Sequence, residues 1–168
     1  MSEGADDLAL IALGSNLGDS AELIRRAFDS LQGLARSPIL RSSLWQSSPV
    51  DCPPDSPLFV NAAAGFFPRP GETPHSLLRQ LQFIEASFGR RRGPVVNAPR
   101  PLDLDLIAFG QRTVQSPDLT LPHPRAHMRR FVLQPLSEIV PNFTLPGAPQ
   151  TIAGLLRGLS CDEAVMRI

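Results

Sequence analysis

An alternating segment, Leu102-Asp103-Leu104-Asp105-Leu106, constrains the fold more than any other part of the chain. Successive side chains of a β-strand point to opposite faces, so the leucines face one way and both aspartates the other. The leucines can enter a core, while the carboxylates lie about 7 Å apart along the strand on one surface. Two such carboxylates repel each other unless a positive group binds between them, and Mg²⁺ commonly takes one or two carboxylates together with phosphate oxygens. The segment therefore indicates a strand with a metal site, although a solvated polar face on an edge strand would show the same alternation.

The other apolar segments predict a regular order of strands and helices. Strands are expected at residues 8–13, 39–46, 58–67 and 102–109. Helices are expected to begin at the capping signals Asp19 and Thr73-Pro74 and to end near Gly33 and Gly89. The order strand–helix–strand–strand–helix–strand predicts an α+β fold of the ferredoxin-like βαββαβ type, an antiparallel sheet with helices on one face.

The C-terminal part of the chain adds further segments. Residues 129–140 are rich in apolar side chains, but Pro135 is expected to kink or split them. Residues 151–159 predict a short helix. We expect these C-terminal helical additions to pack beside the sheet, within one domain that spans residues 1–168.

Composition excludes several classes of function. The chain has 168 residues, of which 42% are hydrophobic, and its 16 acidic and 16 basic residues cancel. A general nucleic-acid-binding protein usually carries a large positive excess, so we expect no nucleic-acid partner. Lysine is absent, which excludes a Walker-type phosphate-binding lysine and a Schiff-base lysine.

Two features indicate the compartment. Cys52 and Cys161 fit no CxxC pattern and are expected to be free thiols in a reducing environment. Residues 1–14 are acidic before a short apolar run, unlike a signal peptide, and that run is too short to cross a membrane. We therefore expect a cytoplasmic protein with no membrane partner.

Arginines flank the acidic pair on both sides. Seven of the sixteen lie near it in sequence, at residues 90–92, 100, 125, 129 and 130. Guanidinium groups bind phosphate oxygens bidentately, so the cluster indicates a polyphosphate site. The glycine and prolines of residues 90–101 indicate a stiff loop that can close over a ligand. His123, held between two prolines, is a candidate for a phosphate or nucleotide contact, with a structural role as the alternative.

A second group of side chains suits a flat heterocycle. Phe59 and Asn61 share one face of the strand expected at residues 58–67. An aromatic ring can stack on a heterocycle while an amide hydrogen-bonds its edge, and Phe131 could supply a second ring surface. A core phenylalanine beside a turn asparagine is the alternative interpretation.

Together these segments resemble the 6-hydroxymethyl-7,8-dihydropterin pyrophosphokinase family of folate biosynthesis. The resemblance covers roughly residues 8–141, in the family's order. The matching motifs are ALGSNLG at 12–18, FVNAA at 59–63, IE at 84–85 with GR at 89–90, PRPLDLD at 99–105, LPHP at 121–124 and RRFVLQPL at 129–136.

The resemblance implies an enzyme that transfers a pyrophosphoryl group from ATP to the hydroxymethyl group of the dihydropterin, giving AMP. It implies that Asp103 and Asp105 hold two Mg²⁺ ions and that Arg90 and Arg92 assist catalysis. The implied ATP-binding residues are Gln82, Glu85, Arg90, Arg92, Arg100, His123 and Arg129. The implied pterin-binding residues are Gly14, Ser48, Pro49, Val50, Phe59, Asn61 and Phe131.

Two departures and three alternatives accompany the resemblance. The family commonly has tyrosine where this chain has Phe59, and tryptophan in the arginine loop where this chain has Asn97. The alternatives are another two-metal phosphate enzyme, a ferredoxin-like RNA-binding module, and a non-catalytic relic of the pyrophosphokinase. We expect a monomer whose partners are ATP and the dihydropterin.

Overall fold

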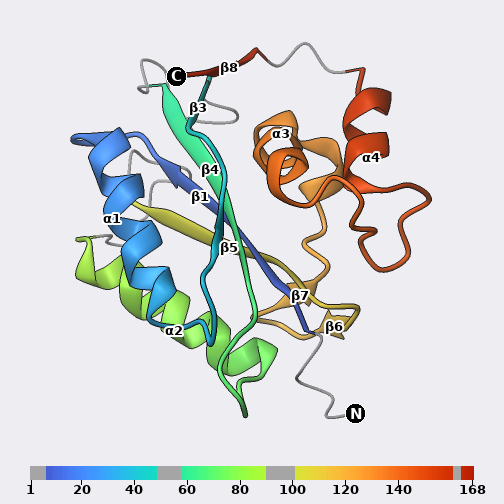
Figure 1. The fold of residues 1–168 in the computed structure, drawn as a ribbon, viewed down its shortest axis with the longest axis horizontal. Helices are drawn as coiled ribbons and strands as arrows, with labels where there is room; N and C mark the ends of the chain where they lie inside the picture. Colours follow the sequence, from blue (N-terminus) through green and yellow to red (C-terminus); the bar gives the residue numbers. More distant parts are fainter. Residues whose placement is uncertain (1–6, 49–57, 90–100, 161–163) are drawn as a thin grey trace.

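The structure, a computed structural model, describes residues 7–48, 58–89, 101–160 and 164–168, and it is built around an antiparallel sheet (Figure 1). Its strands are β1 (Ala9–Ser15), β2 (Leu40–Arg41), β3 (Trp45–Ser47), β4 (Phe59–Phe66), β5 (Asp103–Phe109) and β8 (Val165–Arg167). They lie in the order β5-β1-β4-β3-β8, and β2 also pairs with β4. A separate hairpin consists of β6 (Val114–Gln115) and β7 (Thr120–Leu121).

The helices are α1 (Ser20–Gln32), α2 (Pro74–Ser87), α3 (Arg130–Ile139) and α4 (Ile152–Gly158). Two of them begin where the sequence predicts. The Asp19 side chain accepts a hydrogen bond from the Glu22 backbone N–H at the start of α1. Thr73 and Ser76 form a reciprocal capping box before α2, with Pro74 in its first turn. These caps satisfy backbone N–H groups that have no partner inside the helix.

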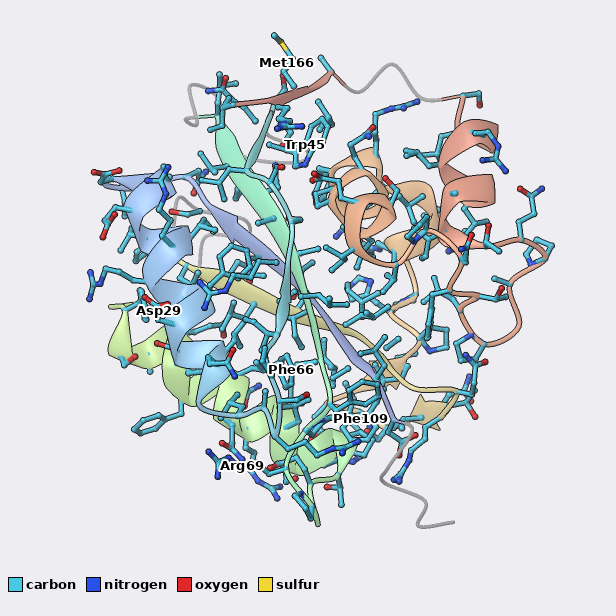
Figure 2. The ribbon with its side chains drawn as sticks, in the orientation of Figure 1. Asp29, Trp45, Phe66, Arg69, Phe109 and Met166 are labelled. Atoms are coloured by element: carbon cyan, nitrogen blue, oxygen red, sulfur yellow. The ribbon has the colours of Figure 1, made fainter. Side chains whose placement is uncertain are left out.

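The two helices of the strand–helix–strand–strand–helix–strand unit, α1 and α2, cover one face of the sheet as expected. The C-terminal additions α3 and α4 cover the opposite face and do not lie beside the sheet, so that part of the expectation is wrong. In Figure 1, α1 and α2 lie on one side of the strands, and α3 and α4 on the other. Phe66 and Phe109 belong to the core beneath α1 and α2 (Figure 2). Leu10 and Ile107 are buried on the opposite face against α3 and α4. Because both sets of alternating side chains on these strands are apolar, each face needs a cover.

Two local features differ from the prediction. The strand expected at residues 39–46 is divided into β2 and β3, both paired with β4. Pro135 lies inside α3, which continues through it from Arg130 to Ile139. The buried side chains on either side of Pro135, Leu133 and Leu136, anchor the helix against the sheet. In the described part of the chain, no helix has the length and hydrophobicity needed to span a bilayer.

Candidate active site

A cleft of about 360 Å³ runs along the free edge of β5, between α2 and the β6–β7 turn. It brings together five residues that the sequence assigned to the metal and ATP sites, although they come from three separate segments. These residues are Gln82, Glu85, Asp103, Asp105 and His123. Leucine and proline side chains from α2 and the turn complete its walls.

Asp103 and Asp105 lie on one face of β5, as the alternation predicts. Leu104 is buried in the core beneath α1 and α2, whereas both aspartates are only partly buried. Their carboxylates are hard oxygen donors, which suit Mg²⁺ when phosphate and water complete its shell. Among the described residues, no group of three or more His, Cys, Asp or Glu side chains is arranged to hold a metal by itself. A pair of carboxylates is a donor set that fits Mg²⁺ when phosphate oxygens and water supply its other ligands.

Glu85 supports the strand that carries these aspartates. Its side chain is only 4% exposed at the end of α2. Its Oε2 accepts a hydrogen bond of 2.7 Å from the backbone N–H of Leu104, the residue between the two aspartates. Among the described strands β5 lies at the edge of the sheet, and on this side the Glu85 carboxylate is the acceptor for the Leu104 N–H.

His123 is a neutral imidazole at neutral pH. Burial lowers its pKa from 6.5 to about 4, with further lowering by the Arg129 and Arg125 guanidinium groups and an opposing effect of Asp103. Its Nδ1 accepts a hydrogen bond of 3.2 Å from the Arg125 backbone N–H. The ring proton of the neutral form therefore lies on Nε2, where it can be donated to a phosphate oxygen.

A second group of residues forms a row across the sheet beside the aspartates. Gly14 of β1 pairs with Asp103 on one side and with Asn61 on the other. A Cβ atom at Gly14 would lie 3.7 Å from both Asn61 Oδ1 and Phe59 Cδ1, so this glycine leaves space in front of both side chains. The predicted pairing of Phe59 with Asn61 on one strand face is therefore confirmed.

Ser47, which is not among the site residues that the resemblance implies, holds the Asn61 amide. Asn61 Nδ2 donates a hydrogen bond of 2.6 Å to Ser47 Oγ, and both residues are buried. This contact orients the amide toward the space above Gly14. The neighbouring Ser48, which the resemblance implied, is exposed. Ser47 pairs with Phe59 across β3 and β4, which brings it beside Asn61. This pairing is a tertiary contact, so no local sequence pattern indicates the role of Ser47.

Arg129 and Phe131 lie together at the start of α3. The Arg129 guanidinium carbon is 5.4 Å from the centroid of the Phe131 ring, and its charge reaches His123. A candidate phosphate-binding residue thus adjoins a candidate ring-stacking residue. The implied site residues Pro49, Val50, Arg90, Arg92 and Arg100, together with Asn97, lie outside the described residues.

The sequence also missed the β6–β7 turn as a wall of the cleft. Residues 117–120 line it, Asp118 among them. A Ser-Pro-Asp turn just before the Pro122-His123-Pro124 segment was the available signal.

The family model and the similar proteins that match this chain all carry the description of the same enzyme family. Residues 10–141 match the model of 7,8-dihydro-6-hydroxymethylpterin-pyrophosphokinase (HPPK). The chain is 37% identical over 153 residues to the 2-amino-4-hydroxy-6-hydroxymethyldihydropteridine pyrophosphokinase of Synechocystis sp., covering 91% of this chain and 76% of that protein. It is 39% identical over 137 residues to the Pseudomonas aeruginosa protein of the same name, covering 81% and 82%.

Solved structures agree at the level of the fold. Plasmodium falciparum HPPK-DHPS with pteroate superposes with a TM-score of 0.66 at 14% identity, covering 90% of this chain and 43% of that one. An HPPK-DHPS in complex with substrates superposes with a TM-score of 0.71 at 12% identity, with the same coverage. This chain thus spans less than half of those longer proteins. The family match and the two relatives show that the chain belongs to the 7,8-dihydro-6-hydroxymethylpterin-pyrophosphokinase family.

Proposed function

We propose that this chain transfers the pyrophosphoryl group of ATP to the hydroxymethyl group of 6-hydroxymethyl-7,8-dihydropterin, giving AMP and the dihydropterin diphosphate in folate biosynthesis. Family membership supports the reaction. The observation that carries the proposal is the sheet register, because Gly14 pairs with both Asp103 and Asn61. Two strand spacings separate those residues by about 10 Å. The residues proposed to bind phosphate and those proposed to bind the heterocycle therefore lie side by side on one sheet face.

The polar residues of the cleft suit the triphosphate. Asp103 and Asp105 would hold Mg²⁺, for which we propose two ions. Bound Mg²⁺ neutralises charge on the triphosphate and on the leaving AMP. His123 would donate its Nε2–H to a phosphate oxygen, and Arg129 would add a charged donor. Arg90, Arg92 and Arg100 remain proposed phosphate ligands from the resemblance.

The side chains around Gly14 suit the pterin ring. Phe59 and Phe131 would stack on the flat ring, and the Asn61 amide, held by Ser47, would hydrogen-bond its edge. The hydroxymethyl oxygen then attacks the β-phosphorus, the bond from that phosphorus to the α–β bridging oxygen breaks, and the hydroxyl proton is released. Positioning and charge neutralisation account for most of the catalysis of such transfers.

We also infer the finer properties of the protein. The strand order β5-β1-β4-β3 supports a ferredoxin-like core. The zero net charge supports the absence of a nucleic-acid partner. Consumption of ATP supports a cytoplasmic location without a membrane partner, and we propose a monomer with one domain.

The decisive experiment measures the products formed from Mg²⁺ and ATP with and without 6-hydroxymethyl-7,8-dihydropterin. We expect AMP that depends on the pterin, and no ADP. ADP or free pyrophosphate would instead favour another phosphate-transfer enzyme. Asp103→Ala should abolish turnover, whereas Asp29→Ala, a matched change on the outer face of α1 (Figure 2), should not. Normal turnover by Asp103→Ala would refute the metal assignment.

A further inference from the structure

A polar cluster at one end of the cleft has no role in the proposed chemistry. Ser116 Oγ donates a hydrogen bond of 2.8 Å to Asp118 Oδ1 in the turn between β6 and β7. His75 Nε2, in the first turn of α2, lies 3.1 Å from Ser116 Oγ and 3.4 Å from the same Asp118 oxygen. Both contacts use Oδ1 and orient the carboxylate, which is 65% exposed at the wall of the cleft.

The cluster is not a hydrolytic triad. In such a triad the histidine takes the serine proton at one ring nitrogen and is oriented by the acid at the other. Here a single nitrogen, His75 Nε2, approaches both partners, and Ser116 donates directly to the acid. The arrangement therefore fixes the carboxylate of Asp118 and does not activate the serine.

The length of helix α2 indicates how far the Asp118 carboxylate lies from Asp103 and Asp105. His75 contacts Asp118, and Glu85, ten residues further along α2, contacts Leu104 between Asp103 and Asp105. Ten residues of α-helix span about 15 Å. The two acidic groups thus stand toward opposite ends of the cleft, with room for the phosphate groups of a nucleotide between them. If the phosphates occupy the Asp103 end, the nucleoside lies at the Asp118 end.

The chemistry of the Asp118 end suits a nucleoside. The hydrogen bond from Ser116 is the main cause that lowers the pKa of Asp118, so its carboxylate is ionised at neutral pH and accepts hydrogen bonds only. It would repel a phosphate but can accept from a ribose hydroxyl, as acidic residues do in other nucleotide sites. Leu78 and Leu119 add apolar surface to the same walls.

We propose that Asp118 is a specificity-determining residue that accepts a hydrogen bond from a ribose hydroxyl of ATP, and that Ser116 and His75 hold it in place. This inference rests on the proposed function, because it takes ATP as the occupant of the cleft. It concerns the choice of nucleotide and not the transfer step. The turn itself also depends on backbone hydrogen bonds between Ser116 and Leu119, so the test must separate sugar recognition from turn stability.

The test compares ATP with 2′,3′-dideoxy-ATP, both as kcat/KM and as equilibrium affinity measured by calorimetry without pterin. Because the proposed hydrogen bond is made to a charged carboxylate, we expect the wild type to prefer ATP over 2′,3′-dideoxy-ATP by about 10- to 100-fold. Asp118→Ala should bring this ratio close to one, and Ser116→Ala should lower it part of the way. Asp118→Asn keeps an oxygen that accepts from Ser116 and supplies the test if the alanine variant does not fold. Asp29→Asn is the matched control and should keep the wild-type ratio.

The preference for ATP over 2′,3′-dideoxy-ATP separates loss of sugar recognition from loss of turn stability. A disrupted turn would weaken all nucleotides alike, so an unchanged ratio in Asp118→Ala would overturn the proposal. Inosine triphosphate lacks the amino group of adenine, and a loss of discrimination against it alone would move the contact to the base and overturn the ribose assignment. The calorimetric ratio does not require turnover. Absence of AMP formation would therefore refute the proposed function without deciding the role of Asp118.

Discussion

Replacement of Glu85 by alanine tests how β5 is held in place. Glu85 is almost fully buried, and its carboxylate accepts the hydrogen bond from the Leu104 N–H. In Glu85→Ala that N–H loses its acceptor while it remains buried at the sheet edge. A buried N–H without an acceptor costs about 1–3 kcal/mol. Because Glu85 is almost fully buried, we expect a value in the upper part of this range, so the free energy of unfolding should fall by about 2–3 kcal/mol.

Urea unfolding and thermal melting measure this loss. For a domain of this size, 1 kcal/mol corresponds to about 2–4 °C in Tm, so Tm should fall by about 4–12 °C. Hydrogen exchange of the Leu104 amide should become faster. Glu85→Gln keeps an oxygen acceptor at the same distance and should recover more than half of the loss. Glu22→Ala, on the exposed surface of α1, is the matched control and should change the stability by about 0.5 kcal/mol or less.

Two results would refute this reasoning. One is a Glu85→Ala variant that unfolds at the same urea concentration as the wild type. The other is a Glu85→Gln variant that loses as much stability as Glu85→Ala, since that would assign the effect to the negative charge and not to the hydrogen bond.

The remaining predictions concern ligand binding, pH and the core. Asn61→Ala should raise the KM for the pterin about tenfold, the effect of one lost hydrogen bond, with little change in the KM for ATP; equal effects on both would contradict the assignment. Because the folded-state pKa of His123 lies near 4 and its ordinary value is 6.5, the unfolded chain binds a proton first as the pH falls below 6.5. Stability should therefore decline by about 1 kcal/mol between pH 7 and 5, after allowance for partial solvent exposure, and urea titrations of His123→Gln should show a smaller decline. Leu133 of α3 is fully buried against the sheet, so Leu133→Ala should cost about 2–5 kcal/mol, and a loss below 1 kcal/mol would show that α3 packs loosely.

Several features of the site could be predicted because their signals are local. The alternation of Leu104 with Asp103 and Asp105 places the carboxylates on one face of β5, as the structure shows. The caps at Asp19 and Thr73 depend on side chains that reach three residues along the chain. The roles of the implied site residues stay predictions, and the assignment of the arginine loop falls outside the described residues.

Other features follow from contacts that no local pattern encodes. The strand expected at residues 39–46 is interrupted because β2 and β3 pair with different parts of β4. Glu138 of α3 accepts hydrogen bonds from Ser43 and Trp45, more than ninety residues away in sequence. Such contacts explain why α3 continues through Pro135: its packing against the second sheet face compensates for the hydrogen bond that proline cannot make.

By itself, therefore, the sequence determined the order of the elements, their caps, the carboxylate pair and the family motifs. Each of these arises from periodicity or from side chains within a few residues, where the geometry of the chain leaves few alternatives. Only the tertiary structure decided that helices cover both sheet faces, that Ser47 holds Asn61, that Glu85 holds β5, and that Asp118 lines the same cleft as the aspartates. These depend on packing between segments distant in sequence, whose free energy is gained only when the whole core is assembled.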